Sequence, residues 1–107
     1  MAWYKREKIE VGSLVTKEDS KSLADGESIS FPAAIEGRGR IWISDNSEKA
    51  DFYFSKAGVV TLENETSGIV ASNTASKLCV YDSGTSIKIL NNTGNEITVN
   101  YSVKYNS

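Results

Sequence analysis

Apolar and polar side chains alternate with a period of two over much of this chain of 107 residues. The apolar positions of residues 97–105 are Ile97, Val99, Tyr101, Val103 and Tyr105, and the polar positions between them are Thr98, Asn100, Ser102 and Lys104. Because successive side chains of a strand point to opposite faces, this pattern predicts a strand with one buried and one solvated face. Residues 91–96 supply a reversal before it, with Gly94 or an Asn at positive φ. Ile87 and Ile89 are expected to contact this strand, from a hairpin or from an opposing sheet.

Similar short runs recur along the chain, each rich in β-branched or aromatic residues and bounded by Gly, Asn, Asp or Ser. They predict strands at residues 28–31, 40–44, 51–55, 59–62, 68–72, 77–81 and 86–90. Short strands separated by frequent turns are typical of sandwiches and barrels. We therefore expect an all-β protein, a single antiparallel β-sandwich of about seven to nine short strands with jelly-roll or immunoglobulin-like topology.

Two segments between these runs lack a clear strand pattern. Residues 16–26 begin with a capping-type Thr16 and Asp19, but the polar residues and Gly26 that follow favour a loop or a single helical turn. The Gly37-Arg38-Gly39 segment is expected to lie between strands. Pro32 is expected at an edge, a bulge or the end of its strand, because proline lacks the N–H that a central strand needs.

Composition and charge argue against several classes of function but do not identify one. The chain has 39% hydrophobic and 24% charged residues, as in an ordinary globular domain. A net charge of -2 argues against nucleic-acid binding, which needs an excess of Lys and Arg. No apolar run approaches the roughly 20 residues of a membrane span, and the charged N-terminus does not resemble a signal peptide. We expect synthesis in a reducing cytoplasm, with Cys79, the single cysteine, as a small buried hydrophobe.

Catalytic and metal-binding patterns are missing from the sequence. Without histidine there is no Ser-His-Asp or Cys-His arrangement, and one cysteine cannot form a thiolate zinc site. Carboxylates that could serve a glycosidase all lie in turns or at strand ends, namely Asp45, Asp51, Glu63, Glu65 and Asp82. The acidic loop at residues 45–51 lacks the glycine of a calcium loop and is expected to be a polar connection. We expect no enzyme, no metal and no cofactor.

Aromatic and arginine side chains are the best candidates for binding. If Ile41 and Ile43 face the core, Trp42 points outward beside Arg38 and Arg40, and Tyr53 points outward in the same way. Trp, Tyr and Arg are enriched at interface hot spots, and an exposed aromatic ring could equally stack on a sugar. The alternative is that the other sheet or a loop covers Trp42.

The N-terminal residues 1–8 form a candidate arm that precedes the sandwich domain of residues 9–107. This arm carries Trp3, Tyr4 and Arg6. Because chain termini are poorly ordered unless they are held in place, we expect the two large aromatic side chains to anchor the arm on a surface. The arm either folds back on its own sheet as an edge strand or docks on another subunit. We include Trp3, Tyr4 and Arg6 among the candidate protein-binding residues.

The segments LADGESISF, DSGTSIKIL and IKILNNTGNEITVNYSVKY resemble those of small β-sandwich proteins of tailed-phage virions. The likeness covers about the last third of the chain and residues 23–31. It implies a non-enzymatic capsid decoration (cement) or head-tail accessory protein, present in the virion as an oligomer and bound to other virion proteins. It transfers no individual functional residue. The alternative hypothesis is a carbohydrate-binding module that uses Trp42 and Tyr53 as stacking platforms.

Overall fold

The computed structural model describes residues 14–45 and 47–106. The candidate arm, with Trp3, Tyr4 and Arg6, lies outside the described residues, as do the first residues assigned to the sandwich domain. The part of the chain that is described contains no helix long and apolar enough to cross a membrane.

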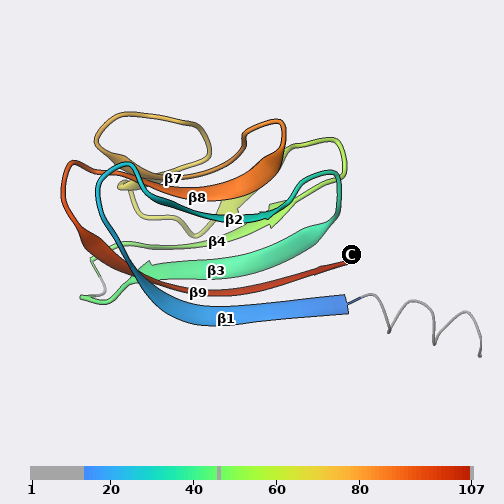
Figure 1. The fold of residues 1–107 in the computed structure, drawn as a ribbon, viewed down its shortest axis with the longest axis horizontal. Coiled ribbons are helices and arrows are strands. Elements are labelled where there is room, and N and C mark those ends of the chain that lie inside the picture. Colours follow the sequence, from blue (N-terminus) through green and yellow to red (C-terminus); the bar gives the residue numbers. More distant parts are fainter. Residues whose placement is uncertain (1–13, 46, 107) are drawn as a thin grey trace, which may run out of the picture.

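Within the described residues, nine strands form two packed sheets, which confirms the expected β-sandwich (Figure 1). The strands are β1 (Leu14–Leu23), β2 (Ser28–Pro32), β3 (Gly37–Ile43), β4 (Lys49–Phe54), β5 (Val60–Glu63), β6 (Ile69–Val70), β7 (Lys77–Asp82), β8 (Ser86–Asn92) and β9 (Ile97–Asn106). The five-stranded sheet has the order β1-β9-β3-β4-β5, and the four-stranded sheet has the order β2-β8-β7-β6. All pairs are antiparallel except the short β6–β7 pair. In immunoglobulin domains the first two strands share a sheet, whereas β1 and β2 lie in opposite sheets.

The expectation of a loop or helical turn at residues 16–26 is wrong, because β1 occupies most of this segment. Ten residues of β1 pair with β9 in unbroken antiparallel register, from Leu14 opposite Asn106 to Leu23 opposite Ile97. The middle of β1 has few apolar residues, so it shows no strand pattern on its own. The long partner strand β9 supplies the backbone hydrogen bonds that determine its conformation.

The expectation that Gly37-Arg38-Gly39 lies between strands is also wrong, because these residues begin β3. A Cβ atom on Gly37 would overlap the ring of Phe54, and one on Gly39 would lie 2.9 Å from the ring of Phe52. The two rings stack with centroids 6.2 Å apart. Glycine is therefore used inside β3 because the phenylalanines of β4 on one side and atoms of Ser102, Val103, Lys104 and Tyr105 of β9 on the other leave no room for a Cβ atom.

The last two strands do not form a hairpin, since β8 belongs to the four-stranded sheet and β9 to the five-stranded one. Ile87 and Ile89 are buried in the core from the opposing sheet, so of the two alternatives expected the hairpin is excluded. Gly94, at φ 94°, provides the positive-φ residue of the connection. At the end of β8 the side chain of Asn91 is fully buried, and its amide donates to the Leu23 carbonyl at the end of β1 and to the Asn95 carbonyl in the β8–β9 connection.

The inner faces of the two sheets form one apolar core. It includes the buried side chains of Ile41, Phe52, Phe54, Leu78, Val80, Ile87, Ile89, Val99 and Val103. Phe31 of β2 packs edge-on against Tyr101 and Tyr105 of β9, so the edge strand of the smaller sheet lies over β9. Cys79 is a free, fully buried cysteine, as expected, and its thiol donates to the Thr74 carbonyl at 3.3 Å. It belongs to the outer face of β7, and the polar loop after β6 covers it.

Candidate functional site: the outer face of the five-stranded sheet

Four of the candidate binding residues lie on one surface, the outer face of the five-stranded sheet. Arg38, Arg40 and Trp42 occupy alternate positions of β3, and Tyr53 of β4 stands directly opposite Arg38. Their alternation is fixed by the buried side chains between them on the same strands. The predicted orientation of Trp42 and Tyr53 is therefore confirmed. Tyr53 is 44% exposed, whereas Trp42 is half-buried.

The registers of β9, β3, β4 and β5 arrange this outer face in three rows that run across the strands. The rows are Lys104-Arg38-Tyr53-Thr61, Ser102-Arg40-Asp51-Glu63 and Asn100-Trp42-Lys49. Only the tertiary pairing brings Lys104, Lys49 and Asp51 beside the candidate residues. The alternation of β9 did indicate that Lys104 and Asn100 face solvent, but it gave no information on which strand lies next to them.

The first row combines two basic residues with an exposed aromatic. Arg38 pairs directly with Lys104 on one side and with Tyr53 on the other. Like charges directly opposite each other on a sheet are destabilising. Both cationic side chains are exposed, so solvent screens most of this repulsion. The row is a local concentration of positive charge on a chain whose net charge is negative.

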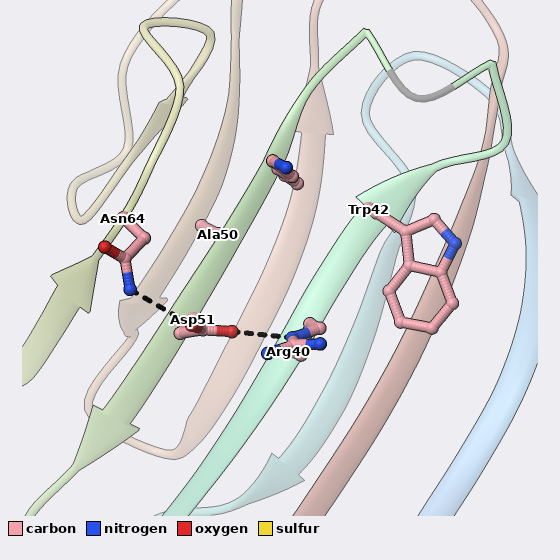
Figure 2. A pocket seen from close by; sticks show the side chains of 6 residues that line it. Arg40, Trp42, Ala50, Asp51 and Asn64 are labelled. Carbon is pink, nitrogen blue, oxygen red and sulfur yellow. Dashed lines mark hydrogen bonds and ion pairs between the residues drawn. The ribbon is translucent and has the colours of Figure 1, made fainter.

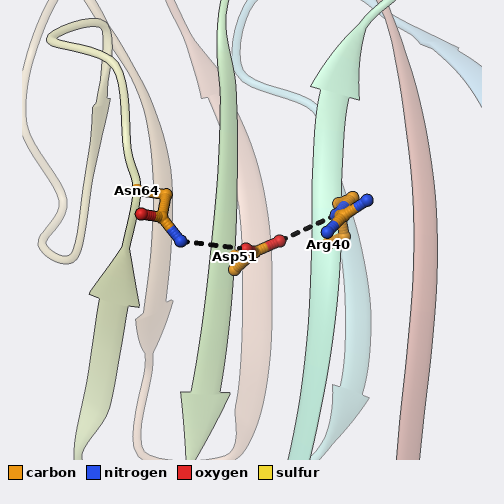
Figure 3. A network of polar contacts seen from close by, with 3 residues as sticks. All are labelled: Arg40, Asp51 and Asn64. Carbon is orange, nitrogen blue, oxygen red and sulfur yellow. Dashed lines mark hydrogen bonds and ion pairs between the residues drawn. The ribbon is translucent and has the colours of Figure 1, made fainter.

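In the second row, Arg40 and Asp51 form an ion pair that extends to Asn64 (Figure 3). Arg40 Nε donates to Asp51 Oδ1 at 2.8 Å, and Asn64 Nδ2 donates to Asp51 Oδ2 at 3.4 Å. The hydrogen bond from Arg40 holds the pKa of Asp51 below its usual value. Asn64 has a φ of 54°, which turns the chain immediately after β5 and places its amide beside β4.

A shallow depression of about 450 Å³ lies between the second and third rows (Figure 2). Its lining residues are Arg40, Trp42, Lys49, Ala50, Asp51 and Asn64. Figure 2 shows Asp51 and Asn64 on one side of Arg40 and the indole of Trp42 on the other. Asn100 of β9 donates to the Trp42 carbonyl at 3.4 Å and to Ser44 Oγ at 2.9 Å. A wider groove continues along the same face past Arg38, Tyr53 and Lys104.

Among the candidate carboxylates, Asp51 is held in an ion pair and lacks the raised pKa of a general acid. Asp51 and Glu63 stand opposite each other on β4 and β5, but both oxygens of Asp51 are engaged by Arg40 and Asn64. A general acid needs a raised pKa, whereas the pKa of Asp51 is lowered. Asp45 and Asp82 accept hydrogen bonds from backbone N–H groups of their own turns. Across residues 14–45 and 47–106, no group of three acidic or cysteine side chains is placed to hold a metal ion.

No protein-family profile matches this chain, and neither a curated protein nor a solved structure matches it. The chemistry of the outer face is therefore the basis on which a function can be assigned. That face combines rigid strands, exposed Arg and Tyr side chains, a half-buried Trp and an open depression.

Proposed function

We propose that this chain is a non-enzymatic assembly protein that docks on a partner protein through the outer face of its five-stranded sheet. The observation that carries the proposal is the placement of Arg38, Arg40, Trp42 and Tyr53 in adjacent positions of β3 and β4. Trp, Tyr and Arg are the residue types enriched at interface hot spots, because Trp and Tyr bury large areas with few rotatable bonds and the Arg guanidinium donates several hydrogen bonds. Strand positions also hold them in place before binding, which reduces the entropy lost on association.

The partner surface is expected to be acidic where it meets the first row. The adjacent charges of Arg38 and Lys104 repel each other in the free protein. A carboxylate placed between them relieves that repulsion and can accept hydrogen bonds from the guanidinium. Tyr53 flanks Arg38 and adds apolar area at the same position. Arg40 is already paired with Asp51, so it contributes mainly through the exposed remainder of its guanidinium.

The resemblance to tailed-phage virion proteins makes a virion the proposed setting, with the chain as a multicopy decoration or head-tail accessory protein bound to capsid or tail subunits. Synthesis would take place in the host cytoplasm. A test uses virions assembled without this chain, to which the purified protein is added back and separated by sedimentation. We expect saturable binding of the wild type, and loss of at least about 100-fold in affinity for the Arg38→Glu/Tyr53→Ala variant.

The four-stranded sheet offers a matched control for this experiment. Lys88 and Tyr81 are also a basic–aromatic cross-strand pair, on the outer face of β8 and β7. The Lys88→Glu/Tyr81→Ala variant changes the same charge and removes the same ring on the opposite side of the sandwich. It is expected to bind virions like the wild type. Equal binding by the Arg38→Glu/Tyr53→Ala variant, or loss with the control variant instead, contradicts the proposed docking face.

The depression beside Trp42 favours a second candidate function, a carbohydrate-binding module. An indole edge next to Arg40, Asp51 and Asn64 could combine stacking on a sugar ring with hydrogen bonds to its hydroxyl groups. Affinity electrophoresis in gels that contain single polysaccharides distinguishes the two functions. Sugar binding requires retardation that Trp42→Ala abolishes and that Arg38→Glu leaves unchanged, whereas a protein-docking face gives no retardation.

A further inference from the structure

Among the strands of residues 14–45 and 47–106, β1 presents a backbone edge with no partner strand and has exposed side chains on both of its faces. It is the outermost strand of the five-stranded sheet, and none of the described strands pairs with its far side (Figure 1). Glu18 and Ser20 lie on the outer face, and Lys17, Asp19 and Lys21 lie on the inner face, where all three are exposed. The inner face is open because the smaller sheet ends over β9. Such edges readily pair with another strand.

One hydrogen bond identifies which backbone groups face outward. The Ser20 N–H donates to Asp19 Oδ1 at 2.8 Å, so it is directed away from the ladder with β9. In an antiparallel strand, alternate residues direct both of their backbone groups to the same side. Glu18, Ser20 and Ser22 therefore direct their N–H and C=O groups to the free edge. The Asp19 carboxylate supplies an acceptor for one of these donors, the Ser20 N–H.

Charge selects one register for pairing β1 with a second copy of itself. When two copies of β1 pair antiparallel about a two-fold axis, the numbers of every two residues that face each other add up to the same value. That value is even, because residues that face each other have their side chains on the same face of the sheet. Each possible register can therefore be named by the residue that lies on the axis. With Asp19 on the axis, Asp19 faces Asp19 and Lys17 faces Lys21. With Glu18 on the axis, Glu18 faces Glu18. With Ser20 on the axis, Asp19 faces Lys21 twice and no like charges are opposed. Axes at Thr16 or Ser22 also oppose no like charges, but they bring no opposite charges together and pair fewer residues of β1.

We propose that the protein forms a two-fold dimer in which β1 pairs with β1 of a second copy, with Ser20 at the axis. The two Ser20 residues exchange N–H···O bonds, and each Glu18 does so with Ser22 of the other copy. Asp19 releases the Ser20 N–H to the partner's carbonyl and turns its carboxylate to Lys21 of the other copy. The two five-stranded sheets join into one sheet of ten strands. This inference does not depend on what the outer face binds.

Cysteine cross-linking reads the register directly. Residues that exchange both hydrogen bonds have Cα atoms about 5.5 Å apart, within the range of a disulfide. Ser20→Cys is therefore expected to form a covalent dimer with itself under mild oxidation. Glu18→Cys and Ser22→Cys are expected to stay monomeric alone and to cross-link when mixed. The wild type is the control, because Cys79 is fully buried.

Charge reversal tests the pairing without a covalent bond. Lys21→Asp and Asp19→Lys each place two like pairs across the axis, and each is expected to weaken dimerisation by about tenfold or more in sedimentation equilibrium. The Asp19→Lys/Lys21→Asp double variant restores opposite charges and is expected to regain the wild-type dissociation constant. Lys17→Asp, which faces the neutral Leu23, is the matched control and is expected to change it by less than about threefold.

Three results would overturn the proposal. A wild type that stays monomeric at millimolar concentration shows that the edge does not pair with itself. Self-cross-linking of Glu18→Cys in place of Ser20→Cys shows a different register. Failure of the Asp19→Lys/Lys21→Asp variant to dimerise more strongly than the single variants shows that Asp19 and Lys21 do not face each other. An unchanged circular dichroism spectrum for each variant is the control that its fold is intact.

Discussion

Replacement of Asn91 by alanine should strongly destabilise the sandwich. The Asn91 side chain is fully buried at the end of β8 and uses its complete hydrogen-bonding capacity. Its amide donates to the Leu23 carbonyl at 2.9 Å and to the Asn95 carbonyl at 2.7 Å. Its oxygen accepts from the Thr93 N–H at 3.0 Å and from the Thr93 hydroxyl at 2.7 Å. These bonds join the end of β1 to the connection between β8 and β9.

The magnitude follows from the groups that Asn91→Ala leaves without a partner. Each intramolecular hydrogen bond contributes about 1 kcal/mol net, and a buried group left unsatisfied costs about 1–3 kcal/mol. The Thr93 hydroxyl keeps its contact with the Asn95 carbonyl at 3.1 Å, so the main losses are at the Leu23 carbonyl and the Thr93 N–H. We expect a decrease of about 3 kcal/mol in the free energy of unfolding, which lowers Tm by about 12–24 °C for a domain of this size.

Urea denaturation followed by tryptophan fluorescence, together with a thermal scan, measures this loss. Asn95→Ala is the matched control, because it removes the same side chain from the same connection but from an exposed position, and it is expected to cost less than about 0.5 kcal/mol. A loss below about 1 kcal/mol for Asn91→Ala would refute the assignment of Asn91 as the residue that ties the two segments together.

Three further predictions concern the outer face and the core. Arg40 lowers the pKa of Asp51, so their ion pair stabilises the fold above the unfolded-state pKa of about 3.9. This stabilisation is lost as the pH falls through the lower pKa of the folded state. Because the pair is largely exposed, the free energies of unfolding of wild type and Asp51→Asn, measured by urea titration, should differ by about 0.5 kcal/mol at pH 7 and converge near pH 2. Gly39→Val should lower the urea midpoint by the equivalent of about 2 kcal/mol or more, since the new side chain would overlap the Phe52 ring, and an unchanged midpoint would contradict the packing. Cys79 should not react with a thiol reagent until the protein is unfolded in urea, and rapid reaction of the native protein would contradict its burial.

The candidate site could be predicted in part because alternation is a local property of a strand. Because Ile41 of β3 and Phe52 and Phe54 of β4 are buried, Arg40, Trp42 and Tyr53 face the other way, whatever the strands pair with. The neighbours of these residues could not be predicted. Lys104 lies beside Arg38 only because β9 pairs with β3, and the two residues are 66 positions apart in the chain. Periodicity carries no information about such a pairing.

The sequence by itself determined the all-β class, the location of eight of the nine strands that the structure describes, and the solvated face of β9, because these follow from side-chain spacing and turn residues. Only the tertiary structure decided that residues 14–23 form a strand, since their conformation depends on the backbone hydrogen bonds of β9 and not on a buried stripe of their own. The tertiary structure also decided that β8 and β9 cross between sheets instead of forming a hairpin. A hairpin and a crossover between sheets fit the same alternating pattern of side chains. The choice between them depends on which strands β8 and β9 pair with, and those strands are distant in the sequence.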